Sequence, residues 1–198
     1  VPVVGDSPGL GAVMKVADKC CVAVVCREEG VPLIDLKTLV VAENPGGRTF
    51  KRLEVAKEAL ECDGIINIPK LKTHAQMFLT LGVKNLFGCV PGKLKPQWHL
   101  SAGVESAHFA AMLLALYSFL SPRLTVMDGI VGMEGNGPGA GDPRKIGLVF
   151  GSADAVALDT VATTVLGAHP LDLPLLKAAS VRGLMTDIDA IEVLGEEI

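Results

Sequence analysis

Aromatic residues, paired cysteines and long apolar runs are scarce in this chain of 198 residues, and each scarcity excludes a class of protein. Phe, Trp and Tyr together make up 4% of the sequence, too few for the platforms on which nucleic-acid bases stack. The formal net charge of −4 also argues against nucleic-acid binding, which usually requires a basic surface. We therefore expect no nucleic-acid partner.

The longest apolar runs, Phe109 to Tyr117 and Cys20 to Cys26, are far shorter than the roughly 20 residues that cross a bilayer. The first residues also lack the basic start and apolar core of a signal peptide. No membrane span is expected, and the 5 cysteines are expected to be reduced, mostly buried thiols of a cytoplasmic protein. Because no Cys-x-x-Cys pair occurs, the chain has no local motif for zinc or an iron–sulfur cluster.

Short apolar segments alternate with helix-like segments, a pattern typical of α/β proteins. Strands are expected at 21–25, 39–42, 65–68, 124–127, 146–150 and 191–194. Helices are expected at 9–19, 54–61, 103–120, 154–166 and 173–179. These elements predict a single layered α/β/α domain over residues 1–198. Its sheet would be mostly parallel, with a mixed sheet left open, and covered by helices on both faces.

The densest group of basic residues lies between Asn67 and Gly88, in otherwise apolar sequence. Residues 65–68 are predicted to form a short buried strand, and alternate residues of an extended chain share a face. Continuing that period places Lys70, Lys72 and His74 on one side, at the carboxyl end of the strand. Open α/β sheets bind their ligands at this edge.

A helix-like segment, 80–86, follows, and if it folds back over the strand it brings Lys84 and Asn85 to the same place. The segment from Pro69 to Gly92 contains no Asp or Glu. Converging basic side chains without nearby carboxylates would attract an anion. The alternative is a solvated basic surface on which the lysine stems cover apolar neighbours.

A glycine-rich segment, Gly132 to Gly141, supplies a second candidate wall for the anion. Glycines permit positive φ and let a ligand approach backbone N–H groups closely, so Gly135, Asn136 and Gly137 are expected to contact it. A helix does not follow the glycines, and neither does a Gly-Lys-Ser/Thr triplet, so dinucleotide-binding and P-loop sites are not expected. The alternative is a long connecting loop.

Four acidic residues lie near these motifs. Asp128 ends a predicted strand and Glu134 lies inside the glycine-rich segment, where either carboxylate could act as a general base, bind a metal or pair with a lysine. Pairing is the commoner outcome. Asp154 is expected to cap the helix that follows it, whereas Asp159 could face either solvent or the site.

Four ordered motifs resemble the prokaryotic domain-of-unknown-function family 362. They are Asn67-Ile-Pro-Lys-Leu-Lys-Thr-His74, Val83-Lys-Asn-Leu-Phe-Gly88, Asp128-Gly with Glu134-Gly-Asn-Gly-Pro138, and Asp154-Ala-Val-Ala-Leu-Asp159. The resemblance implies site residues at Lys70, Lys72, His74, Lys84, Asn85, Glu134, Asn136 and Asp159. Members of this family are often fused to ferredoxin-type domains with paired [4Fe–4S] centres, or annotated with them. From this resemblance the chain is expected to be a fragment that lacks an upstream strand and helix and any ferredoxin module.

The leading interpretation is a cytoplasmic, redox-associated protein whose α/β domain binds a small anionic molecule. A fused or partner ferredoxin-type module would hold the [4Fe–4S] clusters, and no cofactor is expected within this chain. In this interpretation Lys70, Lys72 and Lys84 hold the anion. His74 transfers a proton, and Asp128 or Glu134 orients the His74 side chain. The sequence leaves open whether the protein is an enzyme.

Two alternatives remain open. One is a metal-dependent enzyme in which His74, Asp128 and Glu134, with His99, are the ligands, although their spacing is not typical of a metal site. The other is a non-catalytic scaffold whose lysines dock the acidic surface of a ferredoxin.

Overall fold

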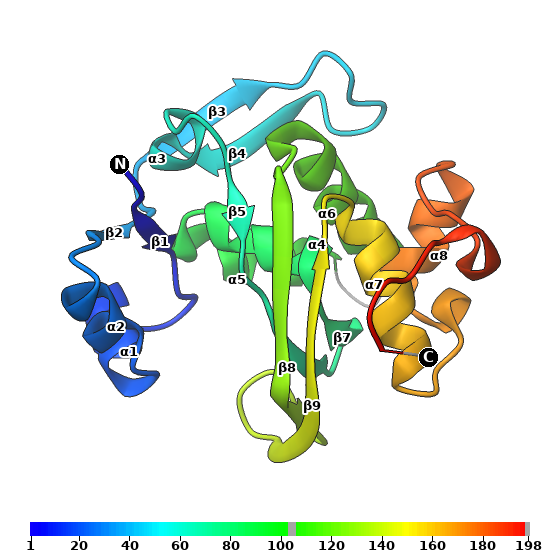
Figure 1. The fold of residues 1–198 in the computed structure, drawn as a ribbon. Helices are drawn as coiled ribbons and strands as arrows, with labels where there is room; N and C mark the ends of the chain where they lie inside the picture. Colours follow the sequence, from blue (N-terminus) through cyan, green and yellow to red (C-terminus); the bar gives the residue numbers. More distant parts are fainter. Residues whose placement is uncertain (103–105, 197–198) are drawn as a thin grey trace. The chain divides into compact units, whose positions relative to one another are not determined.

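The computed structural model describes residues 1–102 and 106–196, and its contacts divide the chain into two compact units. Unit 1 comprises Val1–Asp63 and Phe87–Gly103, and unit 2 comprises Gly64–Leu86 and Val104–Ile198. Figure 1 labels their helices and strands along the chain. The single domain expected over residues 1–198 stays a prediction, and each unit is described by itself.

Unit 1 contains two small sheets. The first joins β1 (Val4–Asp6) in parallel with β2 (Leu33–Asp35), and the second joins β3 (Leu39–Glu43) antiparallel to β4 (Arg52–Ala56). Its helices are α1 (Val13–Lys19), α2 (Val22–Glu28), α3 (Lys57–Leu60) and α5 (Lys95–Ala102), with a short 3₁₀ turn η2 (Gly92–Leu94). The 3₁₀ turn η1 (Leu86–Cys89) begins at the last residue of a unit 2 segment and continues into unit 1.

The turn after β1 is fastened to the later segment of unit 1. Ser7 is 3% exposed, and its Oγ accepts a hydrogen bond of 2.7 Å from the backbone N–H of Gly92. The ammonium of Lys95 donates to the backbone oxygen of Ser7. The sequence predicted that the first helix begins at Gly9. It begins at Val13, because tertiary contacts hold the preceding turn.

Unit 2 carries the segments that the sequence singled out. Its strands are β5 (Ile66–Asn67), β6 (Lys70–His74), β7 (Phe78–Thr80), β8 (Leu124–Glu134) and β9 (Asp142–Ser152). Its helices are α4 (Gly82–Asn85), α6 (Ser106–Leu120), α7 (Ala155–Val165) and α8 (Pro174–Val181), with 3₁₀ turns η3 (Pro170–Asp172) and η4 (Ile188–Ala190). The expected start of the longest helix, at 103, lies outside the described residues.

The five strands of unit 2 form one mixed sheet around β8. Both β5 and β6 pair in parallel with β8, β5 at Leu124 and Thr125 and β6 farther along the strand. The antiparallel pairs are β6 with β7 and β8 with β9. The α/β class is therefore confirmed, with a mixed sheet.

Helices α4 and α7 contact both the sheet and each other, so they lie on the same face of it. Strand alternation sends Thr125 and Met127 of β8 into this covered side, where both are fully buried. On the opposite face Ile66 is 63% exposed and Val149 58% exposed. The strand at 65–68 was expected to be buried, and this was wrong for Ile66 and for Ile68, which is 69% exposed. The side chain of Ile66 lies on the face of the sheet opposite α4 and α7.

Asp154 confirms its expected role as a helix cap. Its Oδ1 accepts hydrogen bonds from the backbone N–H groups of Val156 (2.8 Å) and Ala157 (3.2 Å), which satisfies donors of the first turn of α7. Tyr117 on α6 donates to the same oxygen at 3.1 Å. Burial, together with the nearby carboxylate, raises the pKa of Tyr117 to about 12.

Three further sequence-based expectations were wrong. The strand expected at 21–25 is helix α2, because a short apolar run has no period that separates strand from helix. The strand expected at 191–194 is irregular. Thiols expected to be mostly buried are exposed at Cys20, Cys21 and Cys62, although all five cysteines are free of disulfides.

Candidate functional site

The ladder between β6 and β8 is interrupted beside the two lysines. Lys70 is paired with Asp128, and the next pair is Lys72 with Met133, so β6 advances by two residues while β8 advances by five. On the other side of β8, the register with β9 also shifts between Gly129 and Val131. Such a bulge bends a strand and leaves residues unpaired, which opens a hollow in the sheet surface.

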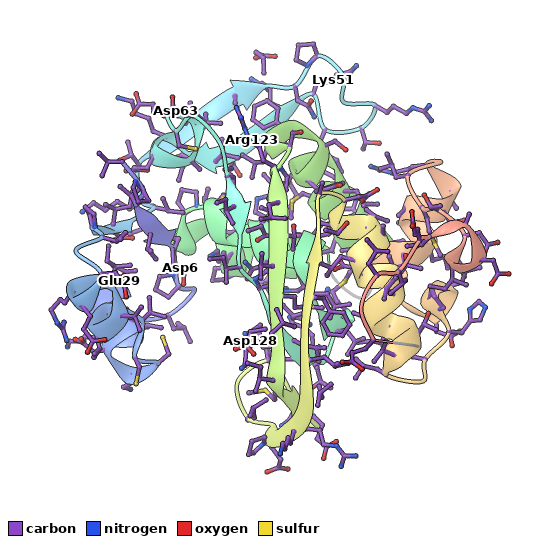
Figure 2. The ribbon with its side chains drawn as sticks, viewed as in Figure 1. Asp6, Glu29, Lys51, Asp63, Arg123 and Asp128 are labelled. Atoms are coloured by element: carbon purple, nitrogen blue, oxygen red, sulfur yellow. The ribbon has the colours of Figure 1, made fainter. Side chains whose placement is uncertain are left out.

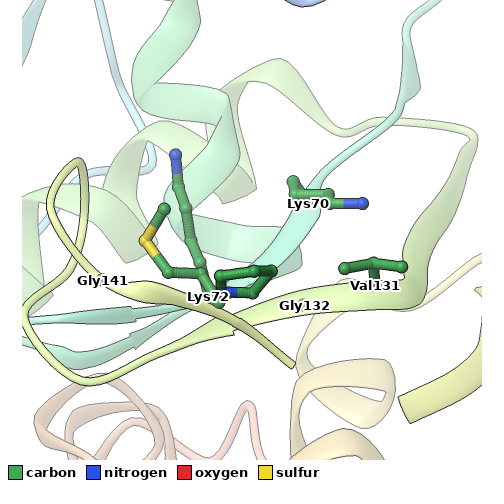
Figure 3. A pocket seen from close by; sticks show the side chains of 7 residues that line it. Lys70, Lys72, Val131, Gly132 and Gly141 are labelled. Atoms are coloured by element: carbon green, nitrogen blue, oxygen red, sulfur yellow. The ribbon is translucent and has the colours of Figure 1, made fainter. Parts of the chain in front are cut away.

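An open pocket of about 350 Å³ lies at this interruption. Two lysines from β6 line one side of it, and residues of β8, of the connection before β9 and of β9 itself line the other (Figure 3). The lining residues are Lys70, Lys72, Val131, Gly132, Met133, Gly141 and Pro143. The lysine ammonium groups are the charged groups of this lining, and the other side chains are apolar or absent.

Lys70 forms an ion pair with Asp128, whose position on β8 is marked in Figure 2. The Nζ of Lys70 lies 2.6 Å from Oδ2 of Asp128, and Oδ1 of Asp128 accepts a hydrogen bond from the backbone N–H of Ile130 at 2.9 Å. The hydrogen bond from Lys70 lowers the pKa of Asp128, so this carboxylate stays ionised near neutral pH. The positive charge of Lys70 is thereby balanced.

Lys72 differs from Lys70 in this respect. It is half-buried, and the ion pairs formed by residues 1–102 and 106–196 do not include it. Figure 3 shows the two lysine side chains leaving β6 in different directions. Lys72 therefore supplies the uncompensated charge of the pocket.

The glycine-rich segment begins as strand and ends as strand, which leaves a short connection between β8 and β9. Gly137 is packed against the end of β6: its carbonyl accepts a hydrogen bond of 3.2 Å from the N–H of Ala75, and a Cβ there would lie 2.0 Å from the oxygen of Thr73. Gly135, with φ of +78°, and Asn136 are exposed in the same connection, and neither lines the pocket. Close backbone packing explains Gly137 without a ligand.

The three residues expected to act in catalysis do not converge. Asp128 is next to the pocket, paired with Lys70. Glu134 lies at the end of β8, 3.8 Å from Nη1 of Arg144, and both side chains are exposed. His74 is 8% exposed, and its Nδ1 accepts hydrogen bonds from the backbone N–H groups of Gln76 (3.1 Å) and Met77 (3.3 Å).

A second group of predicted residues forms a buried polar cluster around α4. Asp159 on α7 is 2% exposed, and its two carboxylate oxygens accept hydrogen bonds from the N–H groups of Gly82 (2.6 Å) and Val83 (3.0 Å). Burial raises the pKa of Asp159 to about 7, although these two hydrogen bonds lower it. Asp159 thus caps α4 from a neighbouring helix.

Asn85 belongs to the same cluster. Its Nδ2 donates to Oδ1 of Asn67 at 2.9 Å, and Nδ2 of Asn67 donates to the carbonyl of Gly82 at 2.8 Å. Lys84 is 9% exposed, with its Nζ 5.9 Å from the ring centroid of Phe109. These contacts tie α4 to β5 and α6.

The structure does not bring Lys84, Asn85 and Asp159 together with Lys70 and Lys72. Helix α4 lies on the helix-covered face of the sheet, whereas strand alternation puts Asp128 and its partner Lys70 on the opposite face. The expected single site is therefore two groups of residues, an open pocket and a buried cluster.

The second wall of the pocket was predicted in part. Gly132, Met133 and Gly141 lie within the glycine-rich segment that was expected to form this wall, whereas Val131 and Pro143, just outside the segment, were missed. One signal was present: Gly129 and Gly132 flank two β-branched residues inside a strand, and glycine within a strand often marks a bulge.

The part of the chain that the structure describes contains no group of three or more His, Cys, Asp or Glu side chains arranged to hold a metal ion. The alternative ligand set of His74, Asp128 and Glu134 thus gains no support from geometry. Among the same residues, no helix is both long and apolar enough to cross a membrane.

Fold and site together define an α/β protein with an open, lysine-lined pocket at an interruption of a mixed sheet. Residues 1–164 match the family described as "Domain of unknown function (DUF362)", and the chain belongs to this family, as its four motifs predicted. No solved structure matches the chain.

The chain is also similar to the "Thylakoid-associated protein sll1697" of Synechocystis sp. (strain ATCC 27184 / PCC 6803 / Kazusa). The two sequences are 42% identical over 189 residues, and the match covers 92% of this chain and 56% of the relative. The chain thus spans little more than half the length of this relative.

Proposed function

We propose that unit 2 binds a small anionic molecule in the pocket between β6 and β8, with Lys72 as the residue that holds its charge. The observation that carries this proposal is the difference between the two lysines. Asp128 balances Lys70 at 2.6 Å, while Lys72 lines the same pocket and has no place among the ion pairs of the described residues. A bound anion would supply the missing counter-charge.

Substitution of Lys72 tests the proposal. Phosphate and acetate are titrated against the protein by isothermal titration calorimetry, and Lys72→Gln is compared with the parent chain. We expect the affinity for a bound anion to fall by about fivefold or more, the scale of a lost charge-assisted hydrogen bond. Equal affinity in parent and variant would refute the role of Lys72.

Lys177 provides the matched control, because it is an exposed lysine on α8 and does not line the pocket. Lys177→Gln removes the same charge from the same unit and is expected to leave the affinity unchanged. A similar loss in both variants would mean that net charge, and not the pocket, attracts the anion.

The redox association is a separate proposal. We infer from the family resemblance that the anion-binding unit works with a ferredoxin-type module or partner that carries [4Fe–4S] clusters, which lies outside these 198 residues. Electron paramagnetic resonance of a full-length family member, reduced with dithionite, tests it: the signal of reduced [4Fe–4S] clusters is expected, and iron-free protein would exclude them.

We further propose that the protein works in the cytoplasm. The relative from Synechocystis is named for its association with thylakoids, which makes attachment to a membrane surface the specific alternative. Fractionation of cells in low and high salt distinguishes the two locations. Recovery in the supernatant at low salt is expected, whereas release from membranes only at high salt would favour electrostatic attachment.

A further inference from the structure

The charge, lining and size of the pocket between β6 and β8 limit the kind of anion that can bind there. The following inference rests on the proposed function, because it concerns the same pocket. Asp128 neutralises Lys70 and is itself held by the N–H of Ile130, so Lys72 contributes one net positive charge. Phosphate and pyrophosphate usually require several cationic or N–H donors, whereas one charge suits a monoanion.

The wall of the pocket opposite the lysines is mainly apolar. Val131, Met133 and Pro143 present apolar side chains, and Gly132 and Gly141 present none. Their backbone positions are also crowded: a Cβ on Gly132 would lie 2.7 Å from Ile146, and one on Gly141 would lie 2.2 Å from the oxygen of Glu134. These glycines keep the strands close and leave a wall that is mainly apolar.

The pocket is small and open to solvent. A volume of about 350 Å³ is at the lower end of the range for small-molecule sites, and the pocket lies on the sheet face of Lys70 and Asp128, opposite α4 and α7. Val131, which lines the pocket, is 42% exposed, so the apolar wall reaches the open surface. A short hydrocarbon body fits such a surface better than a second charged group does.

We propose that the ligand of this pocket is a monocarboxylate with a short apolar body. Its carboxylate accepts hydrogen bonds from the ammonium of Lys72, and its hydrocarbon part packs against Val131, Met133 and Pro143. The apolar wall selects against ligands whose charge is spread over the whole molecule, because those would lose hydration there without compensating partners.

A chain-length series tests the ligand class. Acetate, butyrate and hexanoate, with phosphate and pyrophosphate for comparison, are titrated at constant ionic strength by calorimetry. We expect the affinity to rise by about two- to fourfold for each methylene added, the gain when a methylene leaves water, and both phosphates to bind more weakly than hexanoate.

Two variants assign the parts of the ligand to the parts of the pocket. Met133→Gln keeps the length of the side chain but makes it polar, so it is expected to reduce the chain-length dependence and to spare acetate. Lys72→Gln is expected to weaken all three carboxylates by a similar factor, and Lys177→Gln none. Unchanged melting temperatures would show that the variants are folded.

The outcomes separate this inference from the proposed function. If phosphate binds more tightly than the carboxylates and its binding depends on Lys72, the monocarboxylate class is overturned and the anion site stands. If the carboxylates bind with equal affinity whatever their length, the apolar wall plays no part and the inference is also overturned. If none of the five anions binds in a way that depends on Lys72, both proposals fail.

Discussion

The carboxylate of Asp159, on α7, accepts a hydrogen bond of 2.6 Å from the backbone N–H of Gly82, at the first turn of α4. Helix α4 has only four residues, and a helix this short is not stable alone. The buried carboxylate replaces the side-chain cap that Leu81, at the N-cap position, does not provide. Asp159 therefore stabilises α4, which has no side-chain cap from its own N-terminal residues.

The first prediction concerns the pH dependence of stability. Burial raises the pKa of Asp159 from 3.8 to about 7, so between these values the folded state holds a proton that the unfolded state has released. The contribution of this group is fully present below pH 4 and is lost as the pH rises through 7. We expect the free energy of unfolding of the parent chain, relative to Asp159→Asn, to fall between pH 4.5 and 7.5.

Urea unfolding of both proteins across this range measures the difference, and groups that titrate alike in the two proteins cancel. A difference that grows with rising pH would mean that the hydrogen bonds from Gly82 and Val83 outweigh burial and keep the carboxylate ionised. Burial and the hydrogen bonds predict opposite changes of this difference with pH, so the experiment decides which of the two effects is larger.

The second prediction concerns a buried hydroxyl. Thr80 is 6% exposed, and its Oγ1 has no hydrogen-bond partner among the described residues. Thr80→Val replaces this hydroxyl by a methyl group of similar shape, so we expect the free energy of unfolding to stay the same or rise by about 1 kcal/mol. Thermal and urea unfolding measure the change.

Thr125 is the matched control for that substitution. It is buried as well, at 0% exposed, but its Oγ1 accepts a hydrogen bond of 3.3 Å from Nδ2 of Asn67. Thr125→Val leaves that amide with one partner fewer, and a loss of about 1–3 kcal/mol is expected. Equal destabilisation by both substitutions would indicate that Thr80 has a partner such as an ordered water.

The third prediction concerns two glycines in the connection between β8 and β9. A Cβ on Gly137 would lie 2.0 Å from the backbone oxygen of Thr73, whereas one on Gly139 would meet nothing within 4 Å. We expect Gly137→Ala to destabilise the protein by about 1–3 kcal/mol, the usual range for overpacking, and Gly139→Ala to have little effect. Similar stability of the two variants would show that the connection can move away from β6.

The fourth prediction concerns thiol reactivity. Cys20, Cys21 and Cys62 are exposed, whereas Cys26 is buried and burial raises the pKa of Cys89 to about 12. The thiolate is the reactive form, so native protein at pH 7.5 is expected to be alkylated by iodoacetamide at the three exposed positions first. Peptide mass spectrometry reads the order, with denatured protein as the control. Labelling of Cys89 as fast as Cys62 would contradict the assigned burial.

Local sequence patterns predicted the parts of the fold that depend on near neighbours. Asp154 was recognised as a cap because its position before an apolar helix is a local signal, and the strand at 146–150 lies within β9. The helix α2 was missed because the apolar run 20–26 fits either element. Its helical state depends on how the run packs against the rest of unit 1.

The site was predicted in part for the same reason. The alternation of Lys70 and Lys72 is a local property, and both residues line the pocket. The pairing of Lys72 with Met133 is a contact between distant segments, so the glycines at 129 and 132 could mark a bulge in β8 but could not show that Lys72 lies beside it. Lys84 was assigned to the same site, but its face is set by Asp159 and Asn67, which hold α4 against the other side of the sheet.

The place of β8 at the centre of its sheet has a consequence for synthesis of the chain. Strands β5 and β6 leave the ribosome first, and β8, the partner of both, arrives only after the whole of α6 has been made. At ordinary rates of translation this delay is on the order of seconds. During that time β6 lacks its neighbour on one side, with apolar Leu71 uncovered, so the nascent protein is expected to depend on chaperones until Glu134 has emerged.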